Sequence, residues 1–215
     1  MKKLTYVCIA LVLFSGCYKK SVVLNPNDIH YIISTFLNEH VQYHEFNNTI
    51  SDRTLNNLLS SIDPGKYYFY KNDVDGFTKR YSTLIDDLSK KEDFSFLDDI
   101  FGTYRKRVAE VNDMINQLLK QQYTFTEDET INLDSDKISY AIDKKELKER
   151  WRKNIKLQLL NYQTTDNLKE EQAKEKLKRK FFINNKRIQE LDKAKQFSIF
   201  LNAFSMALDP HTNYL

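Results

Sequence analysis

The sequence predicts an all-α fold, a multi-helix bundle with one small irregular or hairpin excursion, preceded by a signal peptide. Among 215 residues there are only four glycines and three prolines, fewer turn residues than an all-β protein needs. Apolar residues recur at spacings of three and four along most of the chain, which is typical of amphipathic helices. A hydrophobic content of 41% is enough for one domain of good size.

The first two helices are predicted from caps and apolar faces. Asn25–Asp28 offers cap residues for a helix whose apolar face runs from Ile29 to Val41. Ser51-Asp52 is expected to cap a second helix. The sequence Asp63-Pro64-Gly65 favours a turn and ends that helix.

An aromatic run and a long apolar seam follow. Tyr67–Tyr70 is interpreted either as a brief extended piece or as a buried plug. Asn72-Asp73 is expected to cap a third helix that ends near Lys90, and a long helix begins near Ser95. Seven apolar residues of the long helix repeat with a 4-3-4-3-4-3 spacing, which indicates a core helix of a bundle rather than a coiled-coil dimer: Leu97, Phe101, Tyr104, Val108, Val111, Ile115 and Leu118.

The second half of the sequence predicts a polar surface segment followed by two more helices. Gln121–Asp136 turns polar and acidic, which indicates a surface segment that is either irregular or a small hairpin. Asp143 is expected to cap a helix whose core residues are spaced by four: Leu147, Trp151, Ile155 and Leu159. After a break at Thr164–Asn167, one helix is expected to run from Lys169 to Leu208, where Asp209-Pro210 stops it.

The N-terminus resembles an export signal. Met1–Lys3 is cationic, and Leu4–Phe14 is an apolar run too short to span a bilayer. Ser15-Gly16-Cys17 is similar to the lipobox of bacterial lipoproteins, so residues 1–16 are predicted to be removed and Cys17 to be lipidated. The alternative is an ordinary secretory signal with an incidental cysteine. Residues 17–27 then form a tether, and residues 28–215 form the helical domain.

Candidate chemistry is sparse. The net charge of +3 is too small to indicate nucleic-acid binding. No cofactor is expected. His40 and His44 are predicted to lie four apart on the first helix, but a third ligand is missing, so we predict no metal site. The hydroxyls of Ser198 and Ser205 lie on an amphipathic helix without a glycine-rich elbow, so we assign no catalytic residue.

Three stretches carry a family resemblance. The segment Ala207–Leu215 reads Ala-Leu-Asp-Pro-His-Thr-Asn-Tyr-Leu, Asp63–Asp75 combines Asp-Pro with Tyr-Phe and Asp-Val, and Glu149–Asn161 contains Arg-Trp-Arg-Lys. Taken in chain order, the three stretches are similar to the N-terminal helical domain of the tail-specific (C-terminal processing) serine proteases. The resemblance implies that the sequence ends at the start of a linker to a PDZ domain and a peptidase domain.

The resemblance implies that this helical domain is a non-catalytic scaffold of a protease. A Ser-Lys dyad would be encoded beyond these residues, so no activity is expected from this chain alone. Asp209, Pro210, His211 and Thr212 are the candidate linker or docking residues. The expected partners are the PDZ and peptidase portions, protein substrates, a helical-repeat adaptor lipoprotein, and a membrane reached through the lipid anchor. The expected location is the periplasm.

Two other functions remain open. A free-standing helical lipoprotein that binds envelope proteins would share every helical feature of this sequence. A weaker alternative is a metal-binding surface protein that uses His30, His40 and His44.

Overall fold

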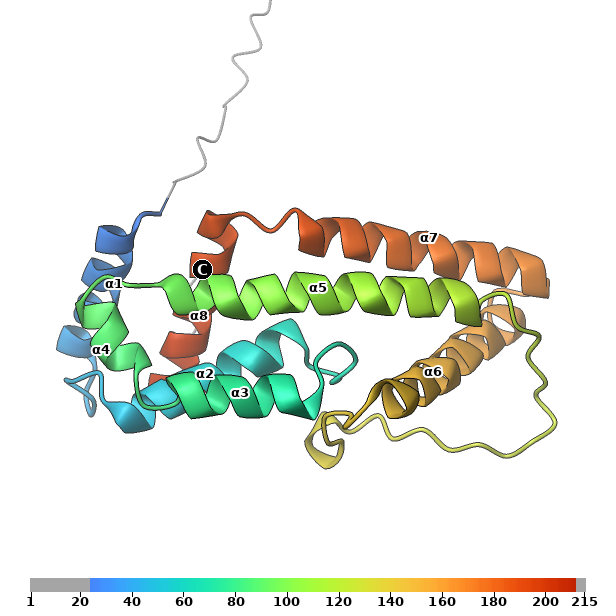
Figure 1. Ribbon diagram of the computed structural model, residues 1–215, viewed down its shortest axis with the longest axis horizontal. Coiled ribbons are helices and arrows are strands. Elements are labelled where there is room, and N and C mark those ends of the chain that lie inside the picture. The colour runs from blue at the N-terminus through green and yellow to red at the C-terminus, as the bar shows by residue number, and fades with distance from the viewer. Residues whose placement is uncertain (1–23, 212–215) are drawn as a thin grey trace, which may run out of the picture.

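The computed structural model describes residues 24–211, which form eight α-helices, one 3-10 helix (η1) and no extended sheet (Figure 1). The predicted all-α fold is confirmed. The helices are α1 Pro26–Glu39, α2 Asn48–Ile62, α3 Lys71–Tyr81, α4 Ile85–Lys90, α5 Ser95–Leu118, η1 Ser135–Lys137, α6 Lys144–Thr164, α7 Glu170–Gln189 and α8 Lys193–Leu208. Within this range no helix is both long and apolar enough to cross a bilayer.

The long helix α5 organises the molecule. Figure 1 shows α7 running beside α5, with α1 to α4 and α8 gathered around one end of α5 and α6 crossing toward the other. The most extensive helix–helix contact joins α2 to α8. The seam predicted for α5 is confirmed, because all seven of its residues are buried.

Two apolar cores lie along α5. The first contains α5 residues up to Val108 and joins α1, α2 and α8 through residues such as Leu58 and Phe204. The second contains α5 residues from Val111 onward and joins α6 and α7 through residues such as Trp151 and Leu177. The fold therefore consists of two helical packing units that share one helix.

Several predicted helix boundaries are confirmed by their capping contacts. The Oδ1 atom of Asp143 accepts the backbone N–H of Glu146 at 2.8 Å at the start of α6. The four core residues predicted for that helix are all buried. At the other end of the chain α8 stops at Leu208, and Asp209 is its C-terminal cap.

The prediction for the first helix was wrong at its C-terminal end. This helix stops at Glu39, because the Nδ1 atom of His40 accepts the backbone N–H groups of Gln42 at 3.1 Å and Tyr43 at 2.9 Å. Such a side-chain contact competes with continued helix. Val41, which was predicted for the apolar face, is instead 96% exposed.

Two further caps were predicted wrongly. The side chain of Asn47, rather than Ser51, caps α2 by accepting the N–H of Ile50 at 3.1 Å. The Ser51 hydroxyl is buried and donates to Asp86 at 2.9 Å. The third predicted helix begins at Lys71 rather than after Asn72 and breaks between Tyr81 and Ile85, which separates α3 from α4.

The long final helix was also predicted wrongly, since it is divided into α7 and α8. The carboxylate of Asp192 accepts the N–H of Lys195 at 2.7 Å and starts a new helix. Because of this break, α8 leaves the line of α7 and packs against α2 in the first core.

The excursion between α5 and α6 is irregular and contains η1. We call residues 120–142 the strap. Its only ladder-like contact is an isolated bridge between Tyr70 and Ala141. No hairpin forms within the described part of the strap, so the irregular alternative holds.

Candidate functional site

The predicted docking residues lie where the chain leaves α8. The N–H of Asp209 donates to the carbonyl of Ser205 at 3.0 Å, and the N–H of His211 donates to the Asp209 carboxylate at 2.9 Å. The first bond is the last of the helical pattern, while the extended backbone of Asp209 and the second bond turn the chain away from the helix axis. Thr212 and Cys17 lie outside the described residues.

A hollow of about 940 Å³ lies beside this turn. Its walls come from the loop after α1, from α2 and from the end of α8, and they include Val41, Tyr43, Arg53, Met206 and Pro210. The early end of α1 exposes Val41 at this place. The structure therefore brings the C-terminal turn beside an open surface formed by residues more than 150 positions earlier.

A second set of residues noted in the sequence forms an internal contact between the turn after α2 and helix α6. We call this contact, made by Asp63, residues 66–70 and the α6 side chains of Arg150, Trp151 and Asn154, the joint. We call residues 63–70 the aromatic turn. The carboxylate of Asp63 is 1% exposed and accepts three backbone N–H groups of this turn: from Tyr67 at 2.8 Å, Tyr68 at 3.0 Å and Phe69 at 2.9 Å. One side chain thus satisfies three successive donors that no helix or sheet pairs.

The aromatic turn depends on a close approach at Gly65. A Cβ atom at Gly65 would lie 2.6 Å from the ring of Tyr67. The left-handed backbone angle falls on the next residue, Lys66, with φ of 54°. The Lys66 ammonium donates to the strap carbonyl of Ser135 at 2.8 Å and also to that of Ile138, so the turn holds the strap as well.

Three side chains of α6 fasten the aromatic turn. The indole N–H of Trp151 donates to the Tyr67 carbonyl at 2.7 Å, and the Asn154 amide donates to the Tyr67 hydroxyl at 2.9 Å. Arg150 donates to the Lys66 carbonyl at 2.6 Å. The rings of Tyr67 and Trp151 pack with centroids 4.9 Å apart.

A bidentate ion pair supports the far end of the turn. The Arg107 guanidinium donates to both carboxylate oxygens of Asp73 at 2.9 Å and lies 4.6 Å from the ring centroid of Tyr70. Asp73 also accepts the Tyr70 N–H at 3.0 Å. Paired guanidinium–carboxylate contacts of this kind are strongly directional, so α3, α5 and the aromatic turn are held in one arrangement.

Burial perturbs the titration of this joint. It raises the pKa of Asp63, while the three backbone N–H donors and the nearby Arg150 act in the opposite direction. Burial, together with the Asp63 carboxylate, raises the pKa of Tyr68 to about 12. The Asp63 carboxylate and the Tyr68 hydroxyl bond to groups of the protein itself, so the joint positions helices.

The joint also links the two cores. The side chain of Phe69 is buried in the first core, those of Tyr67 and Tyr70 pack against the second, and that of Tyr68 packs against both. Both alternatives for Tyr67–Tyr70 therefore capture part of the structure: Phe69 is a buried plug, its three neighbours are partly buried, and Tyr70 makes a single bridge.

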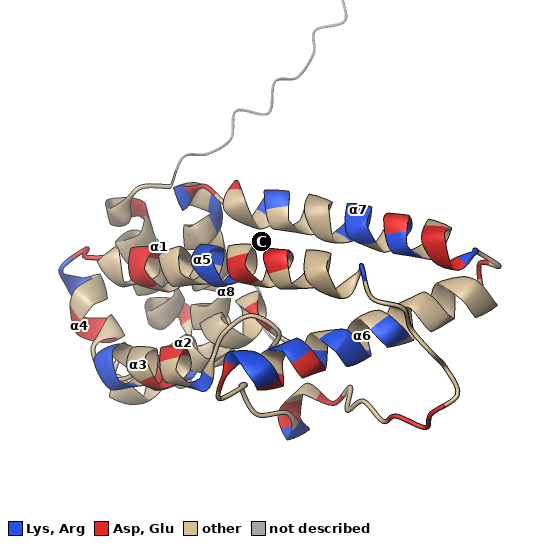
Figure 2. Cartoon of the chain, turned by 45° about the vertical axis from the view of Figure 1, so that its right-hand side comes forward, with Lys and Arg blue, Asp and Glu red and all other residues tan. Residues whose placement is uncertain are grey.

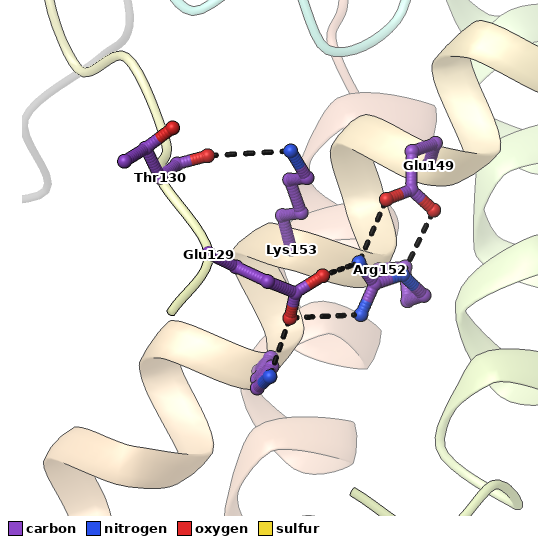
Figure 3. A network of polar contacts seen from close by, with 6 residues as sticks. Glu129, Thr130, Glu149, Arg152 and Lys153 are labelled. Atoms are coloured by element: carbon purple, nitrogen blue, oxygen red, sulfur yellow. Dashed lines mark hydrogen bonds and ion pairs between the residues drawn. The ribbon is translucent and has the colours of Figure 1, made fainter. Parts of the chain in front are cut away.

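Charge holds the strap against α6. Figure 3 shows Glu129 of the strap paired with Arg152. The Glu129 carboxylate also pairs with Lys156. Lys153 donates to the Thr130 carbonyl at 3.3 Å. The contact of Glu129 with Arg152 is the largest cause, and its contact with Lys156 the next, of a pKa lowered to about 2. An acidic segment thus covers the basic face of α6.

The remaining candidates do not gather into a site. The Ser205 hydroxyl is buried and donates to the Asn202 carbonyl at 2.9 Å. His30 and His44 contact the carbonyls of Ser89 and Leu37, and His40 caps a loop rather than lying on α1. The predicted pairing of His40 and His44 on one helix was therefore wrong. Residues 24–211 contain no cluster of three or more histidine, cysteine or acidic residues placed to hold a metal.

The fold and the joint define an all-α domain of two helical cores fastened at one aromatic turn. The family model described as the tail-specific protease N-terminal domain matches residues 32–215, and the chain belongs to this family. It is 23% identical to the tail-specific protease of Haemophilus influenzae over 176 residues, which cover 82% of this chain and 25% of that protein. The chain spans about a quarter of the length of this relative.

The structure brings together two of the three stretches that carry the resemblance. Trp151 and Asn154 contact the segment that begins at Asp63. Sequence analysis did not predict this contact. One feature of the sequence could have indicated the contact. The Arg-Trp-Arg-Lys segment carries several hydrogen-bonding groups, and those that are buried need partners elsewhere in the fold.

Proposed function

We propose that this domain is a non-catalytic helical scaffold of a periplasmic tail-specific serine endopeptidase, which degrades or processes envelope proteins from their C-termini. One observation supports this most strongly. The residues that carry the family resemblance, from Asp63 to Tyr67 and from Arg150 to Asn154, bond to one another. They maintain the shape of the domain, as expected of a scaffold.

The surface beside Pro210 is the proposed docking surface, for the rest of a longer protease, a protein substrate or an adaptor lipoprotein. It combines the exposed Val41 side chain with the Tyr43 ring and the Arg53 guanidinium around the 940 Å³ hollow. An apolar centre with a polar rim is the usual arrangement of a protein-binding surface. The chain also turns beside it at Asp209, so a following domain would be placed close to it.

We also propose that the chain is exported and anchored in a membrane through a lipidated Cys17, as its lipobox-like sequence suggests. Metabolic labelling with radioactive palmitate tests this. Label is expected on the wild-type chain and not on Cys17→Ser. Labelling of neither protein, with normal export of both, would leave an ordinary secretory signal as the explanation.

Incubation with a protein substrate tests the scaffold role. The purified chain is expected to leave casein, and a peptide with a nonpolar C-terminus, uncut. Ser198→Ala and Ser205→Ala serve as matched variants. Cleavage by the wild-type chain that disappears in either variant would show that a serine of this domain is catalytic and would refute the proposal.

A photo-crosslinking amino acid at Val41 tests the docking surface in cells. The control position is Leu133, another exposed apolar residue, on the strap. Crosslinks from Val41 to a polypeptide with PDZ and peptidase sequences are expected. Crosslinks to an unrelated envelope protein would favour the free-standing binding module, and equal yields at both positions would argue against any docking surface here.

A further inference from the structure

Residues 176–187 of α7 carry a basic face with two exposed apolar side chains. The segment 176–187 contains six cationic residues and no acidic one: Lys176, Lys178, Arg179, Lys180, Lys186 and Arg187. Within it the side chains of Phe182 and Ile183 are 62% and 39% exposed. The opposite side of α7 faces the second core through Ala173 and Leu177.

The helical spacing places the apolar pair among the cations. Phe182 lies three residues after Arg179 and four before Lys186, while Ile183 lies four after Arg179 and four before Arg187. Residues three or four apart are neighbours on a helix surface. The result is a protruding apolar centre surrounded by positive charge.

Within residues 24–211, Lys176 makes the one short ion pair of these six cations, to Asp166 at 2.6 Å, and the cations beside Phe182 and Ile183 are only weakly neutralised. Across residues 24–211, neither Arg179 nor Arg187 pairs with a carboxylate, and the pairs of Lys178 and Lys186 are long, at 3.9 and 3.8 Å. The basic face of α6 differs, because the acidic strap lies along it, as Figure 2 shows. Among the described residues no acidic segment pairs with Arg179 or Arg187 in this way, which leaves their charge available to an external anion.

The position of α7 indicates which anionic surface is within reach. Figures 1 and 2 both place α7 along the same edge of the molecule as the first turn of α1. Residues 18–24 can span at most about 25 Å. If the chain is anchored at Cys17, a point that rests on the proposed function, the membrane lies within a short distance of that edge.

We propose that the α7 face around Phe182 and Ile183 binds the surface of an anionic lipid bilayer. The cations contact lipid phosphates, and the two apolar side chains enter the headgroup region. Clusters of lysine and arginine beside exposed phenylalanine have this property on amphipathic helices. A shallow hollow of about 600 Å³ lined by Tyr162, Lys180 and Arg187 adjoins the face and gives room for a phosphate headgroup.

Vesicle co-sedimentation tests the proposal with residues 17–215 carrying Cys17→Ser, the exported form without an acyl group. The probes are vesicles of phosphatidylglycerol and phosphatidylcholine in equal parts, and vesicles of phosphatidylcholine alone. The chain is expected to bind only the first kind, more weakly as salt is raised. Because no acyl group is present, this result does not depend on whether Cys17 is lipidated or on any protease role.

Two variants and a control localise the binding. Arg179→Gln with Arg187→Gln is expected to weaken partitioning about 25-fold, roughly five-fold for each cation. Phe182→Ser is expected to weaken it about ten-fold at low and high salt alike, since apolar insertion is not screened. Lys79→Gln with Lys144→Gln removes equal charge from α3 and α6 and is expected to change partitioning by less than about two-fold.

Three results would overturn the proposal. They are no binding to anionic vesicles at low salt, equal binding to both kinds of vesicle, or equal losses in the α7 variant and the control. An acidic protein partner is the competing occupant. A labelled peptide of alternating glutamate and phenylalanine that binds through Arg179 and Arg187, while vesicles do not bind, would assign the face to such a partner instead.

Discussion

The indole N–H of Trp151 donates a 2.7 Å hydrogen bond to the carbonyl of Tyr67, a residue 84 positions earlier in the chain. This bond joins the centre of α6 to the aromatic turn. The same indole ring packs against Tyr67, Tyr68 and Phe181. Trp151 therefore combines apolar burial with a directional contact, which few other side chains can do.

Substitutions at Trp151 separate these two contributions. Trp151→Phe keeps an aromatic ring but leaves the Tyr67 carbonyl without its donor, and is expected to cost about 1–3 kcal/mol of unfolding free energy. Trp151→Ala also removes the ring and is expected to cost about 3–5 kcal/mol. Urea denaturation followed by far-UV circular dichroism measures both. Phe182→Ala, at an exposed aromatic, is the control and is expected to change stability by less than about 0.5 kcal/mol. Equal losses in Trp151→Phe and this control would show that the bond contributes nothing.

The carboxylate of Asp63 is expected to matter more than its single charge suggests. Asp63→Ala leaves three N–H groups of the aromatic turn unpaired, and should lower the unfolding free energy by about 2–4 kcal/mol. Asp63→Asn places an amide NH₂ toward these donors and should cost about 1–3 kcal/mol. Chemical denaturation of both variants checks this order. Asp113→Asn, at an exposed position on α5, is the control, and a loss of similar size there would contradict the account.

The elements that sequence analysis predicted well are those with sustained apolar repeats or a proline. The seam of α5 has seven members at alternating spacings of four and three, and chance seldom produces such a run. At the end of α8, Asp209-Pro210 removes a backbone donor and forces a stop. In both cases the local sequence determines the structure.

The boundaries that were predicted wrongly depend on single side-chain contacts. His40 ends α1 through a ring nitrogen, and Asp192 starts α8 inside a charged stretch that is compatible with continuous helix. No glycine or proline marks either break. The choice between one helix and two was decided by packing of α8 on α2, which local sequence does not encode.

The joint was beyond sequence analysis for a related reason. Its two halves, at Asp63 and Trp151, are separated in the chain by all of α3, α4, α5 and the strap. Sequence analysis interpreted the first half as a turn followed by an aromatic run and the second as a core position of a helix, and linked both to one family, but did not place them in contact. That they contact each other follows from the path of α5, along which both cores form.

Gly65 is expected to tolerate no side chain. In Gly65→Ala the new methyl group would lie within 3 Å of the Tyr67 ring, which Trp151 and Asn154 hold in place. A destabilisation of about 1–3 kcal/mol is expected from this overpacking. Thermal and urea denaturation of Gly65→Ala measure it, with Gly102→Ala as the control, since a Cβ there meets no atom within 4 Å. A harmless Gly65→Ala would mean that the ring can move aside.

The strap is expected to lose its attachment in acid. Free glutamate titrates near pH 4.3, while contacts with Arg152 and Lys156 lower the pKa of Glu129 to about 2. Because the folded value is lower, this stabilisation is complete above about pH 4.3 and is lost as the pH falls toward 2. The amide resonance of Thr130 should therefore titrate with a midpoint near 2, and this transition should be absent in Glu129→Gln. A midpoint near 4.3 would show that the ion pairs are weak in solution.

The central claim is that the Asp63 carboxylate holds the aromatic turn as a rigid joint between the two cores. Native-state hydrogen exchange of the Tyr67, Tyr68 and Phe69 amides, followed by NMR, tests it most directly. The account predicts that these three amides exchange as slowly as the core amides of α5 and α6, and much faster in Asp63→Asn. Exchange in the wild-type chain as fast as that of exposed strap amides would contradict it.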